Sequence, residues 1–188
     1  MSTTAADLTT HELPVGTWEL DTAHTSVDFV ARHMMVTKVR GHFGDFDGRI
    51  HIGESLDDGY AEASFKTSSI YTNQVQRDEH LRSGDFLEIE RYPEMTFRTT
   101  KVEPAGKGKF TVAGDLTIKD VTRPIELEAR FHGTTKGMKG DVLFFEAEGE
   151  FDREDFGLTW NMALEGGGWL VSKKIRLEIE GQAVRQEA

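Results

Sequence analysis

The sequence predicts an all-β fold, an eight-stranded antiparallel barrel with a helical insertion near residues 73–90. Apolar and polar residues alternate with a period of two in eight short segments, which is the pattern of half-buried antiparallel strands. Glycine and aspartate separate these segments, as they do at turns. One longer stretch, residues 73–90, breaks the alternation.

The length of 188 residues fits one domain with a core of its own. We expect residues 1–14, which are rich in Ser, Thr and Ala, to form a flexible tail, because termini are ordered only where something holds them. Residues 15–188 then form a single domain that begins to fold near Trp18.

The strand pattern is clearest near the C-terminus, where Ile175, Leu177 and Ile179 share one face and Arg176 and Glu178 the other. The other alternating segments are residues 27–31, 46–52, 61–67, 95–99, 110–118, 125–131 and 145–151. A sheet of this size has unpaired edges unless it closes, so the pattern favours a barrel.

The helical insertion starts where alternation stops. The run from Gln74 to Leu81 is typical of a helix, and we place it as a lid or plug at one mouth of the barrel. Pro93 ends the insertion because proline lacks an amide donor, so the next strand is expected to begin at Glu94.

The composition of the chain argues against several classes of function. A net charge of −11 is expected to repel nucleic acid and anionic membrane surfaces, and the chain has no cysteine for disulfides, thiolate metal sites or nucleophiles. No segment approaches the ~20 apolar residues of a membrane span, and the first residues do not resemble a secretion signal. We therefore expect a cytoplasmic protein that binds no nucleic acid and does not span a membrane.

The chemical motifs favour no catalytic or metal site. His24, His33, His42 and His51 are nine residues apart, which on extended strands points them to opposite faces. Acidic pairs are frequent in a chain with 33 acids, so they single out no glycosidase site. Phosphate-binding and nucleophile-elbow motifs are absent, and the glycine run 166–168 indicates a hairpin.

Aromatic side chains occur in nearly every predicted strand, and small residues such as Ala31, Ala61, Ala63 and Ala129 share their faces. In an eight-stranded barrel this mixture favours an apolar tunnel over a filled centre.

Five segments resemble the YceI-like family. They are WELDTAHTSVDF (18–29), VRGHF (39–43), RDEHLRSGDF (77–86) with YP (92–93), GDLTIKDVTRP (114–124) and REDFG (153–157). The resemblance covers residues 16 to 185 in order. It implies a lipocalin-like barrel, often dimeric, that holds a long polyisoprenoid or related amphiphilic lipid and has no catalytic activity. We expect no cofactor.

The first hypothesis is therefore a non-enzymatic carrier, storage or sequestering protein for an isoprenoid lipid. The alternatives are an enzyme that acts on such a lipid and a haem or metal barrel that uses His24, His33 or His42.

The expected site follows from placing the more apolar face of each strand inside the barrel. Arg77, His80 and Arg82 could contact a polar head group, with solvated salt bridges as the other interpretation. The residues expected to contact the lipid tail are Phe29, Ala31, Leu81, Phe86, Phe97, Phe131, Ile175 and Leu177.

Overall fold

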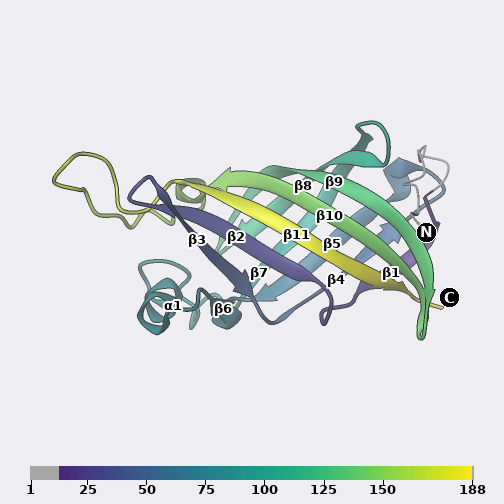
Figure 1. Ribbon diagram of the computed structural model, residues 1–188, viewed down its shortest axis with the longest axis horizontal. Coiled ribbons are helices and arrows are strands. Elements are labelled where there is room, and N and C mark those ends of the chain that lie inside the picture. Colours follow the sequence, from purple (N-terminus) through teal and green to yellow (C-terminus); the bar gives the residue numbers. More distant parts are fainter. Residues whose placement is uncertain (1–12, 188) are drawn as a thin grey trace.

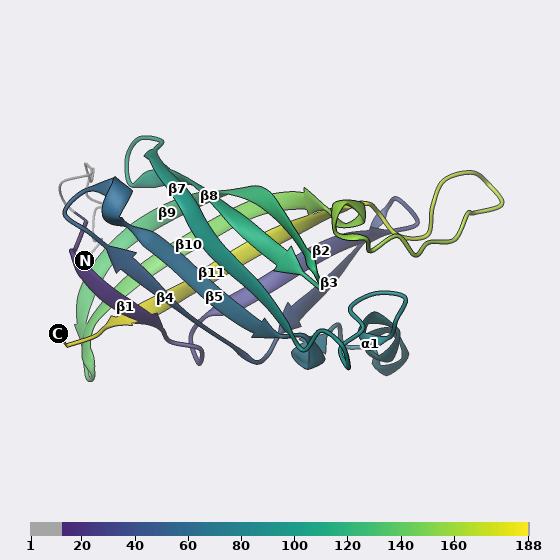
Figure 2. The same ribbon diagram turned by 180° about the vertical axis from the view of Figure 1, so that it is seen from behind.

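In the computed structural model, which describes residues 13–187, the chain forms one closed antiparallel barrel (Figures 1 and 2). The strands are β1 (Gly16–Leu20), β2 (Ser26–His33), β3 (Thr37–Phe43), β4 (Phe46–Ile52), β5 (Tyr60–Lys66), β6 (Ile70–Tyr71), β7 (Glu94–Pro104), β8 (Lys109–Ile118), β9 (Val121–Gly137), β10 (Gly140–Asp152) and β11 (Lys174–Arg185). The helices are α1 (Val75–Arg82) and the short 3₁₀ turns η2 (Leu56–Asp58), η3 (Thr67–Ser69) and η4 (Arg153–Phe156).

These eleven strands make an eight-stranded barrel because three strands of the barrel are each interrupted and counted as two. The interrupted strands are β1 with β2, β3 with β4, and β5 with β6. β1 and β2 pair with successive parts of β11, and β4 and β3 pair in turn with β1 and β2. In the same way, β5 pairs with β4 and β6 pairs with β3. The β1–β11 ladder closes the ring, so the predicted eight-stranded antiparallel barrel is confirmed.

The first interruption, between β1 and β2, is held by Asp21. Its amide donates to Gln182 O at 2.9 Å, and its carboxylate accepts from Gln182 Nε2 at 2.9 Å. The hydrogen bonds from Gln182 and His24 lower the pKa of Asp21. The turn is thereby bonded to β11, and the strand resumes on the same ladder.

The helical insertion is confirmed. α1 covers Val75–Arg82, so it begins and ends one residue later than the predicted run, and Gln74 caps its first turn by accepting from the Arg77 amide at 2.5 Å. β7 begins at Glu94, directly after Pro93, as predicted. The glycine run forms a hairpin in which Ala163 bridges to Trp169.

The tail prediction lies mostly outside the described residues. Of residues 1–14 only Leu13 and Pro14 are described, and Pro14 O accepts a hydrogen bond from Trp18 Nε1 at 3.1 Å. Trp18 is fully buried with Leu143 and Ala183, so the chain enters the fold close to the predicted residue.

The barrel wall contains glycines where an aromatic ring of the neighbouring strand lies close to the backbone. A Cβ at Gly41 would overlap the Phe29 ring, and a Cβ at Gly114 would overlap the Phe97 ring. Both rings belong to the inner face of the barrel. The glycines therefore let large rings lie along the wall instead of crossing the interior.

We predict that Gly114→Ala lowers the free energy of unfolding by about 1–3 kcal/mol, because the added methyl displaces Phe97 in a packed wall. Gly84→Ala is the matched control, since no atom lies within 4 Å of its added Cβ. It should be neutral or slightly stabilising. Urea unfolding of both variants measures the difference, and equal stabilities would contradict this account of Gly114.

Candidate functional site

A cavity of about 750 Å³ runs through the barrel. Every strand contributes side chains to its wall, and most of them are aliphatic or aromatic. At one end the wall includes Leu56 and Tyr60, and at the other it includes α1 and the segment after η4. We call this second end the mouth, defined by Arg77, His80, Trp160, Leu170 and Val171. The tunnel expected from the sequence is present.

The structure brings together all the residues predicted to contact a lipid tail. The wall contains Phe29, Ala31, Leu81, Phe86, Phe97, Phe131, Ile175 and Leu177. Contact with a ligand stays a prediction, but all eight side chains share one apolar space. Ala129, Val112, Leu127 and Ala147 line the same space.

The three predicted head-group residues lie in two environments. Arg77 and His80 belong to the cavity wall at the mouth. Arg82 lies outside that wall, and its guanidinium donates to Ser68 O at 3.0 Å and to Ile70 O at 2.8 Å. These bonds connect α1 to η3 and β6, so Arg82 has a structural role.

Polar contacts attach α1 to the barrel. The helix is charged around most of its circumference, so it has little apolar face to bury. Asp78 is buried and accepts from the Thr72 amide at 2.8 Å and from Thr72 Oγ1 at 2.5 Å. Arg77 Nε donates to Thr72 Oγ1 at 2.7 Å and Nη2 donates to Thr72 O at 2.8 Å. This network fixes the start of α1 beside β6.

His80 stands at the centre of an aromatic contact at the mouth. Its ring meets Trp160 edge-on, with centroids 4.5 Å apart, and Phe86 edge-on at 5.1 Å. Its Nε2 lies 2.8 Å from Asp85 Oδ2. One ring edge of His80 is therefore within hydrogen-bond distance of a carboxylate, and the ring also forms part of the cavity wall.

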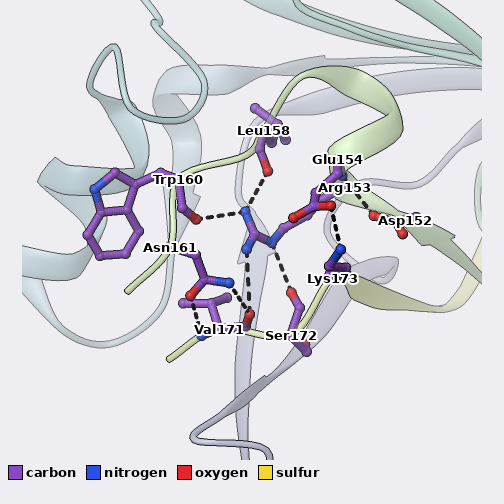
Figure 3. A network of polar contacts seen from close by, with 9 residues as sticks. All are labelled: Asp152, Arg153, Glu154, Leu158, Trp160, Asn161, Val171, Ser172 and Lys173. Carbon is purple, nitrogen blue, oxygen red and sulfur yellow. Dashed lines mark hydrogen bonds and ion pairs between the residues drawn. The ribbon is translucent and has the colours of Figure 1, made fainter. Parts of the chain in front are cut away.

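Arg153 is a wall residue that the sequence did not single out (Figure 3). Its side chain is 2% exposed, and its guanidinium points into a ring of backbone carbonyls. It donates to Leu158 O at 2.5 Å, Ser172 O at 2.9 Å and Trp160 O at 3.0 Å. Burial lowers the pKa of Arg153, because desolvation penalises the charged form, and the nearby Glu154 and Asp152 oppose that effect.

The carbonyls around Arg153 belong to both ends of the loop between η4 and β11. One buried cation therefore fastens the base of the long segment 158–172 to the barrel. Asn161 adds two bonds across the same base, from Nδ2 to Val171 O at 2.8 Å and from the Val171 amide to Oδ1 at 3.0 Å. Arg153 opens a motif quoted above for the family resemblance, REDFG, but nothing in its spacing reveals this role.

Two other properties bear on function. Within residues 13–187, no three His, Asp or Glu side chains are grouped so that they could hold a metal ion. In the same residues, no helix has the length and apolar character needed to cross a bilayer.

Comparison with known proteins gives a consistent result. The family model described as YceI-like domain matches residues 18–183. UPF0312 proteins of Staphylococcus aureus are 36% identical over 168 residues, which covers 86% of this chain and 94% of theirs.

Solved structures have the same fold. The YCEI protein of Campylobacter jejuni is 30% identical with a TM-score of 0.71, covering 83% of this chain and 90% of its own. BcnA of Burkholderia cenocepacia has a TM-score of 0.74 at 20% identity, over 88% of this chain and 99% of that one. A polyisoprenoid binding domain from Saccharophagus degradans has a TM-score of 0.65 at 13% identity, over 92% and 100%.

We predict that Arg153→Met lowers the free energy of unfolding by about 2–4 kcal/mol, because it leaves buried carbonyls without donors. Amides of residues 158–172 should exchange hydrogen faster. Arg153→Lys should recover only part of the loss, since an ammonium cannot reproduce the planar fork. Arg123→Met, at an exposed position, is the control and should change stability by less than about 0.5 kcal/mol. Equal effects at both positions would rule out the fastening role.

Proposed function

Since the chain belongs to the YceI-like family, we propose that it binds a long isoprenoid or similar amphiphilic lipid inside the barrel, without catalysis, as a carrier, storage or sequestering protein. The observation that carries this proposal is the cavity. Its volume of about 750 Å³ falls within the roughly 300–1,000 Å³ of small-molecule sites. A solved neighbour of the same fold is described as a polyisoprenoid binding domain.

The shape and chemistry of the cavity support a long apolar ligand. An elongated tunnel with aliphatic and aromatic walls offers a flexible hydrocarbon chain continuous contact, worth about 0.8 kcal/mol for each buried CH₂. Polar groups that could orient a head group occur at the mouth, where Arg77 and His80 reach the wall. We propose that the tail extends inward past Leu81 and Phe97 and that the head group lies near these two residues.

The alternatives are a haem or metal barrel and an enzyme that acts on the lipid. His24, His33 and His42 belong to no three-residue metal cluster among residues 13–187. An experiment distinguishes an enzyme from a carrier. An enzyme would change the mass of the lipid that it holds, whereas a carrier would release the lipid unchanged.

Native mass spectrometry of freshly purified protein, followed by organic extraction, tests the proposal. We expect an added mass that is removed by extraction and that corresponds to an isoprenoid-type lipid. Protein that carries no added mass and takes up no polyprenol from detergent solution would refute the proposal. Turnover of the recovered lipid on incubation would favour the enzyme instead.

Blocking the tunnel provides a second test. Ala31→Trp and Ala129→Trp put a large ring into the cavity, so we expect them to reduce co-purified lipid at least about tenfold at a modest cost in melting temperature. Glu126→Trp is the matched control on the outer face of β9 and should retain lipid. Full lipid retention in stable, folded Ala31→Trp and Ala129→Trp proteins would show that the ligand lies elsewhere.

The resemblance also suggests a homodimer, which stays a prediction, as does the cytoplasmic location expected from the sequence. The outward faces of the strands carry many charges, for example Glu126, Glu128 and Arg176, so a continuous apolar interface is not expected there. Light scattering at micromolar concentration measures the oligomeric state, and a pure monomer would remove the dimer claim without affecting the barrel.

A further inference from the structure

Two loops project beyond the barrel at the mouth of the cavity. They are the turn between β2 and β3 and the long loop between η4 and β11, which extends farthest at the left of Figure 1. Their exposed apolar side chains are Met34, Met35, Val36, Met162 and Trp169. We call these five residues the rim surface.

The two loops form one unit. The Met34 amide donates to Leu170 O at 2.8 Å, and His33 forms a bridge with Val171. The Leu170 amide donates to Met162 O at 2.9 Å. The carbonyl contacts of Arg153 hold the base of the longer loop. The rim surface therefore has a defined shape, although its side chains face solvent.

The exposure of these side chains is unusual for residues of their kind. Val36 is 74% exposed, Met35 57%, Met162 55%, Met34 49% and Trp169 48%. Half of the large apolar side chains that are exposed among residues 13–187 gather on this surface. Contiguous apolar groups with a charged border mark interaction sites more often than scattered ones do.

The turn itself has a conformation that its residues disfavour. Met34 and Met35 both have positive φ, 52° and 64°, and the Val36 amide donates back to His33 O at 3.1 Å. A hairpin turn of this form prefers Asn and Gly at these two positions. Two methionines add backbone strain and expose apolar surface, and strain of this kind gathers at functional sites.

Charge near the rim surface differs from that of the whole chain. Segments 30–40 and 159–174 contain five Lys and Arg residues and a single Glu, in a chain of net charge −11. Arg40 and Lys174 pair with acids on the barrel strands, and Lys173 pairs with Glu154 in η4. Arg32 and Lys38 flank the methionine turn and form none of the ion pairs found within residues 13–187.

The rim surface is continuous with the cavity. His33 and Leu170 are part of the cavity wall and bond to rim residues. Val171, also in the wall, forms the bridge with His33. We propose that the rim surface docks onto an anionic lipid bilayer, with its apolar side chains in the interface and Arg32 and Lys38 at the head groups, so that the mouth opens toward the membrane. This inference rests on the proposed lipid-binding function. A second copy of the chain is a poorer partner, because it would bring like charges together.

Flotation with vesicles tests the proposal. The probes are vesicles of phosphatidylglycerol and phosphatidylcholine in equal parts and vesicles of phosphatidylcholine alone. We expect the protein to float with the anionic vesicles and more weakly with the neutral ones. The double variant Val36→Glu, Trp169→Glu should bind the anionic vesicles at least about tenfold more weakly, since it removes apolar contact and adds repelling charge.

Met138→Glu is the matched control, because Met138 is fully exposed on the β9–β10 hairpin at the opposite end of the barrel. It should bind vesicles as the unaltered protein does. Lys38→Glu is a second test variant if the double variant does not fold, and it should weaken binding roughly fivefold.

The outcomes separate docking from lipid binding, because native mass spectrometry is applied to the same samples. Protein that carries lipid but does not float with anionic vesicles would overturn the docking proposal and leave the proposed function intact. Equal losses in Met138→Glu and the double variant would also overturn it. A dimer that the double variant dissociates, without vesicle binding by the unaltered protein, would assign the surface to a second copy. Failure of the function itself would appear as protein without lipid.

Discussion

Closure of the sheet between β1 and β11 is the constraint on which the rest of the molecule depends. An open sheet of this size must cover its edges and fill its inner face, whereas a closed one pairs its backbone groups around the ring. The wall then holds together through ladders as well as side-chain packing. Because of this, the interior can keep a cavity of about 750 Å³ that an ordinary core would have to fill.

The mouth is held together by different interactions from those in the wall. Near α1 and the loop after η4 the chain is not part of the β-ladders, and polar side chains form hydrogen bonds with its backbone groups. Asp78 accepts hydrogen bonds from the amide and hydroxyl of Thr72. Arg153 donates to backbone carbonyls at the two ends of the loop, such as those of Leu158 and Ser172. These buried polar contacts are directional, so they can fix loops around an opening where apolar packing would tend to close it.

The sequence indicated most of the barrel because strand periodicity is local. Seven of the eight alternating segments lie within a strand, and the eighth, 61–67, runs one residue past β5 into η3. The helix at Val75–Arg82 departs from the pattern that its neighbours follow. The interruptions after Leu20 and Phe43 could not be predicted, since they depend on ladder partners far along the chain such as Gln182. The role of Arg153 could not be predicted either, because its partners are backbone carbonyls, which every residue type has. The inward-pointing residues of the site could be predicted from the sequence, because alternation along a strand determines which side chains point into the barrel.

The strained turn at Met34 and Met35 shows how the barrel supports its own exposed parts. Six register pairs between β2 and β3, from Asp28 with His42 to His33 with Thr37, fix both ends of the hairpin. With its ends fixed, the turn has few other conformations, so it holds positive φ angles that an isolated loop of these residues would leave. Arg153 does the same for the neighbouring loop by bonding its two ends. Both loops are therefore held at their bases while their tips stay exposed.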